Sequence, residues 1–383
     1  MKQSIVAVVP FDGGVTIRWS DNSQPAMFHH IWLRDNCGCS VCRHPQTWER
    51  TLDTYSLDPQ LGPTALHHES DALHVRWSDG HESAFPAAWL HDHRYGVLDA
   101  RADLPPHVLW NAAVQDDLPH IDHADVMRDD DGLQRFVEQV WTHGVTFVRG
   151  APTTDEALPA LARRVGHMRE TNFGLDWHVI AMIEPNNVAY TSLALHSHTD
   201  LPNRETPPGM QFLHCLVAEA PGGDSTLVDG FWVAEQIRHD DPETFDLLSS
   251  VAVPYRFHDN EHDLRWSAPV IGLGANDQLR EVRFHTALRA PLDVAPSLVG
   301  PMYRAMRVFD GWCRNTAARI TSHLEPGDVM VFHNRRVLHG RTAFDPAGGR
   351  RRLHGLYVDV DEWTSRLRML RQAEPRPVRP GPG

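Results

Sequence analysis

The chain has 383 residues, of which 41% are hydrophobic and 22% are charged. This length suits one large globular domain or two smaller ones, and the composition excludes a disordered or fibrous protein. The formal net charge of −14 argues against a protein that mainly binds phosphate backbones, so we expect no nucleic-acid partner. No run approaches the roughly 20 apolar residues of a membrane span, and the apolar run 5–10 is too short for a signal peptide, so we expect a cytoplasmic protein with no membrane partner.

The N-terminal part of the chain predicts a small domain rich in β-strands. Its short β-prone runs are separated by turn signals such as Asp79-Gly80. A segment with several prolines and little periodicity follows, which is typical of a linker. We therefore predict an N-terminal domain at 1–102 and a linker at 103–120. The strands expected in this domain are 15–19, 26–32, 73–77 and 83–85.

The rest of the chain predicts helices packed against a core of strands. Apolar residues recur at helical spacing over 133–141 and 301–320. A shorter helix is expected at 156–165, where Pro159 either lies in the first turns or marks a later start. The strands do not alternate regularly with helices, so we expect a mainly β fold with flanking helices, a barrel or jelly roll rather than a doubly wound parallel sheet. The expected strands are 145–149, 209–216, 225–228 and 329–333, in a second domain at 121–372 followed by a loose tail at 373–383.

Three of the five cysteines stand close together, at Cys37, Cys39 and Cys42. A disulfide framework would spread its cysteines along the chain, so this cluster favours a structural zinc site with four Cys or His ligands. The alternative is three ordinary thiols. The residues leave the fourth ligand open between His44, which is nearest in the chain, and His81, which lies in a turn.

The triplet His198-x-Asp200 is a candidate iron site. At the extended end of a strand, residues two apart point to the same side, so an imidazole and a carboxylate can bind one metal there. The triplet alone is not selective, because chance predicts about three His-x-Asp/Glu triplets in this composition. The chain contains six, which begin at His67, His120, His123, His198, His239 and His323.

The context of His198 distinguishes it from the other five. A predicted strand leads into His339, which would complete the two-histidine, one-carboxylate set of non-haem iron oxygenases. Arginines follow at 350–352, and an arginine can hold the far carboxylate of a 2-oxo acid by a two-pronged ion pair. The alternative is a set of ordinary histidines with a solvated arginine cluster.

Seven short motifs occur in order along nearly the whole chain. Together they resemble the gamma-butyrobetaine dioxygenase family, the zinc-containing branch of the taurine dioxygenase-like Fe(II)/2-oxoglutarate oxygenases. The motifs are Trp32-Leu33-Arg34-Asp35-Asn36-Cys37, Asn187-Val188-Ala189-Tyr190, His198-Thr199-Asp200, Gln211-Phe212-Leu213-His214-Cys215, Gly222-Gly223-Asp224-Ser225, Leu338-His339-Gly340-Arg341 and Tyr357.

The resemblance implies a small zinc-binding domain followed by a double-stranded β-helix, or jelly roll, that carries iron and catalyses the reaction. It places 2-oxoglutarate on Arg351, with Arg350 and Arg352 as neighbouring alternatives, and on the hydroxyl of Ser225. It implies zinc on Cys37, Cys39, Cys42 and His81, and catalytic iron on His198, Asp200 and His339.

The resemblance also implies an aromatic cage for a trimethylammonium group, whose charge ring faces attract. Trp177, Tyr190 and Tyr357 fall on cage positions, and Asn187 matches a polar substrate contact. The chain departs from the family where Phe173 and Leu201 replace tyrosines, and the region of a second polar substrate contact, around His285 and Thr286, does not match.

The implied reaction is hydroxylation of a small quaternary-ammonium substrate such as gamma-butyrobetaine with O2, releasing succinate and CO2. Alternatives within the same branch are trimethyl-lysine, a quaternary-ammonium phosphonate or another small amino acid. A different class of protein, a metal-binding protein without turnover, is the other alternative. Related enzymes suggest a homodimer.

Overall fold

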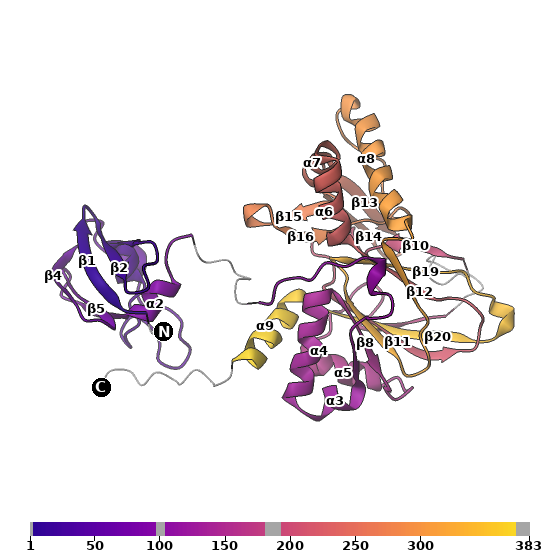
Figure 1. Ribbon diagram of the computed structural model, residues 1–383, viewed down its shortest axis with the longest axis horizontal. Coiled ribbons are helices and arrows are strands. Elements are labelled where there is room, and N and C mark those ends of the chain that lie inside the picture. The colour runs from indigo at the N-terminus through magenta and orange to yellow at the C-terminus, as the bar shows by residue number, and fades with distance from the viewer. Residues whose placement is uncertain (1–2, 97–103, 181–192, 373–383) are drawn as a thin grey trace. The chain divides into compact units, whose positions relative to one another are not determined.

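The computed structural model describes residues 3–96, 104–180 and 193–372, which belong to two compact units. Of the described residues, 3–96 belong to the N-terminal unit, and 104–180 and 193–372 belong to the C-terminal unit. Figure 1 colours the chain from one end to the other, and each unit is described by itself below. No helix within these described ranges is both long and apolar enough to cross a bilayer.

The N-terminal unit consists of two three-stranded antiparallel sheets with orders β1-β2-β3 and β4-β5-β6. Buried and exposed residues alternate along β5 and β6, and the buried ones form one shared core that includes Phe28, Leu73 and Trp77. The elements are β1 Ile5–Phe11, β2 Gly14–Trp19, β3 Ala26–His29, α1 His30–Asp35, β4 Pro63–His68, β5 Ala72–Trp77, β6 Glu82–Pro86 and α2 Ala87–Asp92.

The predicted strand 26–32 is wrong in its second half. The strand β3 ends at His29, and α1 begins at His30. Within α1, Leu33 is fully buried while Ile31 is exposed, so a helical turn buries the apolar side chain that the core needs. A short apolar run does not distinguish a strand from a helix by periodicity alone.

Two sheets pack face to face in the C-terminal unit, and their strands pair antiparallel except for the edge pair β7 and β8, which is parallel, so the predicted jelly roll is confirmed. A six-stranded sheet has the order β7-β8-β18-β11-β20-β9, and a four-stranded sheet has the order β10-β19-β12-β17. Side chains from both sheets share one core, for example Leu213 and Phe332 with Leu227 and Ile320. The strands are β7 His120–Asp122, β8 Val145–Arg149, β9 Asp176–Val179, β10 Leu195–His198, β11 Met210–Ala218, β12 Ser225–Asp229, β17 Arg319–Ser322, β18 Val329–His333, β19 Val337–Arg341 and β20 Arg351–Val358.

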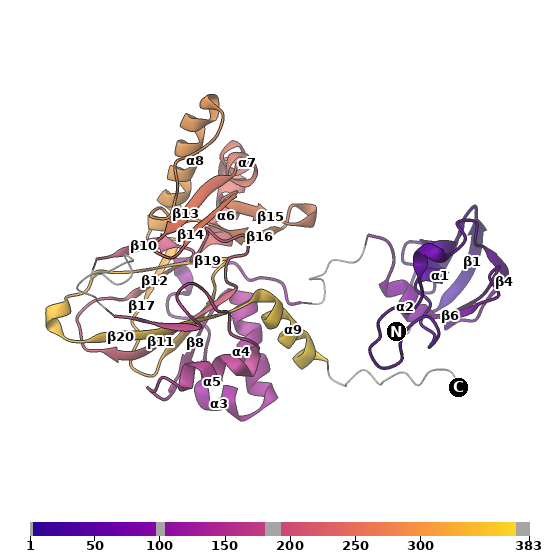
Figure 2. The same cartoon turned by 180° about the vertical axis from the view of Figure 1, so that it is seen from behind.

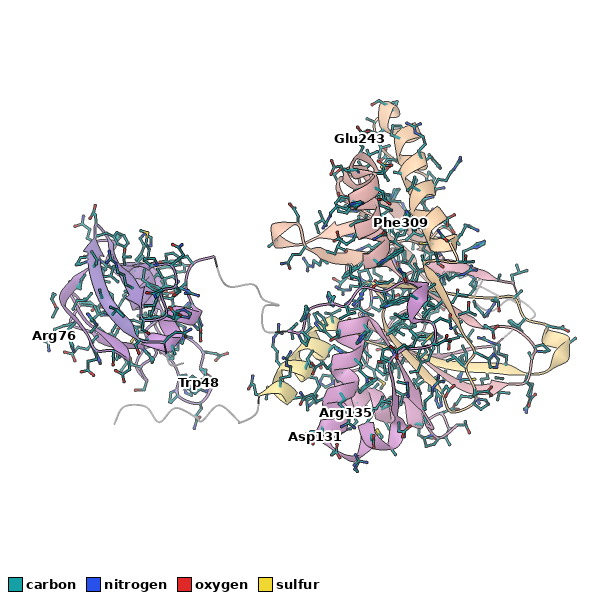
Figure 3. The ribbon with its side chains drawn as sticks, viewed as in Figure 1. Trp48, Arg76, Asp131, Arg135, Glu243 and Phe309 are labelled. Carbon is teal, nitrogen blue, oxygen red and sulfur yellow. The ribbon has the colours of Figure 1, made fainter. Side chains whose placement is uncertain are left out.

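Helices cover the outer face of the six-stranded sheet, as Figures 1 and 2 show from opposite sides. The apolar stripe of α4, from Leu133 to Trp141, packs against this face, whereas Asp131 and Arg135 point away from it (Figure 3). The Asp129 carboxylate caps the start of α4 by accepting the Gly132 N–H, and Gly144 ends it with a positive φ of 77°. The helices are α3 His123–Arg128, α4 Asp130–His143, α5 Ala157–Val165 and α9 Val360–Arg371.

The segment between β12 and β17 forms a second helical layer with two hairpins. Phe309 of α8 lies inside its core (Figure 3). The predicted helix 301–320 is shifted, because α8 begins at Pro296 and ends at Arg314. Proline is well suited to the first helical position, and the residues that follow α8 pair with β12 as strand β17. The elements are α6 Gly230–Asp240, α7 Pro242–Ser250, β13 Val253–His258, β14 Asp263–Ala268, β15 Ile271–Leu273, β16 Leu279–Val282 and α8 Pro296–Arg314.

The stretch expected to be a linker makes contacts with the C-terminal unit. Leu104 and Trp110 are buried in hydrophobic clusters of this unit. The Trp110 indole donates a hydrogen bond of 2.6 Å to the His143 carbonyl. The boundaries at 102, 120 and 372 stay a prediction.

Candidate active site and zinc site

Three thiols and one imidazole converge in the N-terminal unit. The Nε2 atom of His81 lies 3.3 Å from the sulfur of Cys37 and 3.5 Å from the sulfurs of Cys39 and Cys42. Tetrahedral ligands at ordinary zinc bond lengths are about 3.6 Å apart, so this donor set fits zinc. The structure brings His81 to the thiols, whereas His44 accepts N–H groups of its own loop.

Two charged neighbours, Arg34 and Asp79, contact Cys42 and His81 of this cluster. Arg34 donates to the Cys42 sulfur at 3.2 Å and to the Asp79 carboxylate at 2.9 Å. The other oxygen of Asp79 accepts the N–H of His81 at 2.9 Å. Burial raises the pKa of the Cys42 thiol to about 12, so a bound cation is what would hold this group as the thiolate.

The predicted iron ligands meet where β10 pairs with β19. His198 and His339 are register partners on these antiparallel strands, and Asp200 follows two residues after His198. The carboxylate oxygen Oδ1 of Asp200 lies 3.3 Å from Nε2 of His198 and 3.7 Å from Nε2 of His339. Ligand atoms at right angles around one metal are about 3 Å apart, so the three side chains fit the facial triad of a non-haem iron centre.

Hydrogen bonds orient two of the three ligand side chains, His198 and Asp200. The Nδ1 atom of His198 lies 2.7 Å from the His196 carbonyl, which leaves Nε2 for a metal. The Tyr357 hydroxyl donates to Oδ2 of Asp200 at 2.6 Å, which leaves Oδ1 for a metal. Burial opposes ionisation of Asp200, but the two imidazoles and this hydroxyl outweigh it and lower the pKa of the carboxyl. Burial also lowers the pKa of His339 to about 3, so this imidazole is neutral and able to bind a metal.

Asn334 fixes the main chain of Asp200, and sequence reasoning missed it. The Asn334 side chain is fully buried; its oxygen accepts the Asp200 N–H at 2.7 Å, and its amide donates to the Asp200 carbonyl at 3.1 Å. This pair of bonds imitates strand pairing at the point where β10 has ended. The position of Asn334, one residue after β18, offered no local pattern that would reveal this contact.

The structure also separates the six His-x-Asp/Glu triplets. The triplet at His198 has His339 as a third possible ligand, and the triplet at His67 has His74, which lies across an exposed hairpin. In the part of the chain that the structure describes, the other four triplets, at His120, His123, His239 and His323, have no third ligand within such a distance.

The three consecutive arginines have different partners. Arg350 pairs with Glu219 at 2.8 Å, and Arg352 pairs with Asp155 at 2.8 Å. Arg351 donates to the Gly223 carbonyl at 3.1 Å, and it makes no ion pair with any carboxylate in the described ranges. Of the three guanidinium groups, that of Arg351 is therefore the one suited to an added carboxylate.

A second cation lies beside Arg351, and sequence reasoning did not assign it a role. Arg341 is buried and is the register partner of Ser225 across β12 and β19. The guanidinium groups of Arg341 and Arg351 lie 4.9 and 5.5 Å from the ring centroid of Phe344. Burial and the charge of Arg351 lower the pKa of Arg341 to about 10. Strand periodicity could have indicated this residue, because Arg341 is two positions after His339.

The structure brings two of the predicted cage residues together beside Asp200. The rings of Trp177 and Tyr357 are 4.4 Å apart, and the indole lies so close to Gly355 that any side chain there would collide with it. Leu201 is buried directly after Asp200, whereas Phe173 packs on Phe257 at 5.6 Å. The predicted contacts Asn187 and Tyr190 lie outside the described residues.

Comparison with known proteins decides the family. Residues 100–357 match the family model for taurine catabolism dioxygenase TauD, TfdA family, and residues 10–91 match gamma-butyrobetaine hydroxylase-like, N-terminal. The chain belongs to this dioxygenase family. The match confirms the predicted relationship and the predicted enzyme class, a 2-oxoglutarate-dependent dioxygenase.

Individual relatives cover almost the whole chain. The chain is 39% identical to gamma-butyrobetaine dioxygenase of Pseudomonas sp. (strain AK-1) over 96% of both proteins. It is 34% identical to the mitochondrial trimethyllysine dioxygenase of Rattus norvegicus, over 90% of this chain and 82% of that one. A crystal structure of a taurine dioxygenase from Burkholderia xenovorans superimposes with a TM-score of 0.50 at 15% identity, covering 66% of this chain and 89% of the other, which supports the fold.

Proposed function

We propose that this chain hydroxylates a small quaternary-ammonium substrate, with gamma-butyrobetaine as the first candidate, using Fe(II), 2-oxoglutarate and O2. The observation that carries this proposal is the position of Tyr357, whose hydroxyl binds Asp200 while its ring packs on Trp177. A cation against these two ring faces would lie next to the iron ligands. The identity to a gamma-butyrobetaine dioxygenase favours the same substrate class.

The chain's own residues would then have distinct tasks. His198, Asp200 and His339 would hold iron, which supplies the oxygen activation that couples decarboxylation of 2-oxoglutarate to substrate hydroxylation. Arg351 would bind the distal carboxylate of 2-oxoglutarate with help from Ser225 and from the neighbouring charge of Arg341. Trp177 and Tyr357 would orient the substrate by its cationic end.

The second candidate substrate is trimethyl-lysine. It carries the same trimethylammonium group on a longer chain, and a trimethyllysine dioxygenase matches 90% of this chain. Leu201 replaces a larger family residue beside Asp200, which favours a longer or bulkier substrate. A quaternary-ammonium phosphonate would use the same cage and belongs in the same screen.

We further propose that Cys37, Cys39, Cys42 and His81 hold one structural zinc ion. The support is a closed set of four donors with tetrahedral spacing and a charged frame around it. Homodimeric assembly and a cytoplasmic location stay predictions, and light scattering of the purified protein would test the former.

The direct test is a screen for succinate formation with a panel of betaines and amino acids. We expect turnover that depends on Fe(II) and 2-oxoglutarate and is highest with trimethylammonium substrates. A protein that binds Fe(II) and 2-oxoglutarate but turns over none of the panel would be a metal-binding protein without this activity, which contradicts the proposal.

A further inference from the structure

A cavity of about 220 Å³ lies in the C-terminal unit beside the predicted iron centre. One of its walls is His285, whose ring centroid is 4.6 Å from that of His198. Its floor is apolar, since Phe284 and Met306 are buried there. The hydroxyl of Tyr255, also in the lining, is already used in a bond of 2.7 Å to the Arg283 carbonyl. A ligand in this cavity would therefore contact an apolar floor. The ring of His285 would lie between this ligand and the iron ligand His198.

The charged groups of the cavity are predominantly positive. Arg289 lines it, and its Nη1 atom is buried with no hydrogen-bond partner among the residues that the structure describes. The Arg289 guanidinium lies 4.8 Å from the ring centroid of Tyr303, and Arg307 adds a second cation one turn along α8. Asp310 is the acidic member of the lining, and its carboxylate is held by Arg314 at 2.6 Å.

The main chain holds Arg289 in place. The N–H of Ala290 donates to the Pro254 carbonyl, and Arg289 forms a bridge with Tyr255 of β13. The arginine therefore extends from a strand-like segment with a fixed backbone. A buried N–H donor without a partner is costly unless a ligand or water accepts its hydrogen bond.

We infer that this cavity binds a carboxylate carried on a short aliphatic chain, with Arg289 as its anchoring cation. A guanidinium pairs well with a carboxylate, and the apolar floor suits an alkyl chain. The two arginines disfavour a cationic end such as trimethylammonium, since the carboxylate of Asp310 is already paired with Arg314. The carboxylate would come either from the acidic end of the substrate or from a separate acid. The first source rests on the proposed function, whereas carboxylate binding itself does not.

The test measures butyrate binding by calorimetry to the full-length iron-loaded protein under nitrogen, with saturating 2-oxoglutarate. The cosubstrate occupies its own site at Arg351, so butyrate reports on the cavity. Wild-type protein should bind butyrate at least about tenfold more tightly than its neutral isostere butyramide, because the ion pair is lost with the charge. This comparison needs no variant.

Arg289→Gln should weaken butyrate binding at least about tenfold, and Arg289→Lys, which keeps the charge, should weaken it less. Arg304→Gln is the matched control, because Arg304 is an exposed arginine of α8 that does not line the cavity. Equal affinity for butyrate and butyramide would overturn the inference. So would unchanged butyrate binding in Arg289→Gln.

Kinetics separate the two sources of the carboxylate. If the cavity receives the substrate's own acid, Arg289→Gln raises KM for gamma-butyrobetaine without changing KM for 2-oxoglutarate, and butyrate competes with the betaine. If the acid is separate, KM for the betaine is unchanged while butyrate binding is still lost. Butyrate binding by a protein that hydroxylates no betaine would contradict the proposed function and leave the cavity site standing.

Discussion

The two candidate metal sites differ in how their ligands are distributed along the chain and in how completely they surround a metal. Three zinc ligands lie within 37–42, and the fourth, His81, completes a closed set of four donors. The iron ligands His198 and Asp200 are joined by the distant His339, and three donors leave positions open for other ligands. Loss of a ligand should therefore affect folding at the zinc site and chemistry at the iron site.

The largest effect should come from breaking the closed site. Cys39→Ser removes one of four ligands, and we expect unstable or insoluble protein, because a structural zinc contributes roughly 10 kcal/mol or more to the folding of a small domain. Soluble yield and zinc content measured by atomic emission check this. His44→Ala is the control, because His44 lies outside the cluster and should leave both quantities unchanged. Well-folded, zinc-free, active Cys39→Ser protein would contradict the zinc assignment.

Breaking the open site should abolish turnover but not folding. His198→Ala or Asp200→Ala should reduce succinate formation to background while the thermal midpoint stays close to that of the wild type. His120→Ala and His239→Ala are matched controls, since they remove His-x-Asp triplets that have no third ligand in the described ranges. If a control variant loses turnover and His198→Ala keeps it, the wrong triplet has been chosen.

A smaller effect should follow from removing one hydroxyl next to the open site. Tyr357→Phe keeps the ring against Trp177 but deletes the bond to Asp200, so Fe(II) affinity should fall about tenfold or more. Anaerobic metal-competition titration measures this without turnover. Tyr55→Phe, at an exposed tyrosine of the N-terminal unit, is the control. Equal Fe(II) affinities of the wild type and Tyr357→Phe would show that the hydroxyl does not position the carboxylate.

The smallest expected effect is a pH dependence that comes from a histidine outside both sites. Burial, together with nearby histidines such as its register partner His354, lowers the pKa of His214 to about 4. An unfolded histidine titrates near 6.5, so below that pH the unfolded chain binds the proton first and stability falls as pH falls. Between pH 7 and 5, His214 should account for about 1 to 2 kcal/mol of lost unfolding free energy.

Denaturant unfolding at the two pH values measures this loss. His214→Gln should flatten the pH dependence by that amount. His239→Gln, at an exposed histidine, should leave it unchanged. A pH dependence in His214→Gln equal to that of the wild type would contradict the assignment to this group.

Local patterns in the sequence predicted the parts of the sites whose members lie close together. The cysteine cluster and His198-x-Asp200 were identified from short spacings, as were the amphipathic stripe of α4 and the strand β18. Ligands that come from distant parts of the chain were harder to predict. The sequence did not decide whether His44 or His81 is the fourth zinc ligand, and the folded hairpin brings His81 to the thiols. Periodicity failed at the ends of β3 and α8, where a short apolar run continues into a different element.

The supporting residues of the iron site could not be predicted for a physical reason. Asn334 binds the main chain of Asp200 from another sheet, and such a contact depends on register rather than on local composition. Tyr357 was expected as a cage wall, whereas its bond to Asp200 needs the positions of two strands. Arg341 and Arg351 meet at Phe344 only after β19 and β20 are placed.

The most direct test of the central claim is the preference for a cationic substrate over its uncharged copy. The measurement compares kcat/KM for gamma-butyrobetaine with that for the analogue in which a tert-butyl group replaces trimethylammonium. Ring faces attract a desolvated cation by roughly 2 kcal/mol, so we expect the neutral analogue to be at least about tenfold poorer, and Trp177→Leu to erase most of this difference. Turnover of only uncharged or anionic compounds would contradict the account and make Trp177 and Tyr357 packing residues.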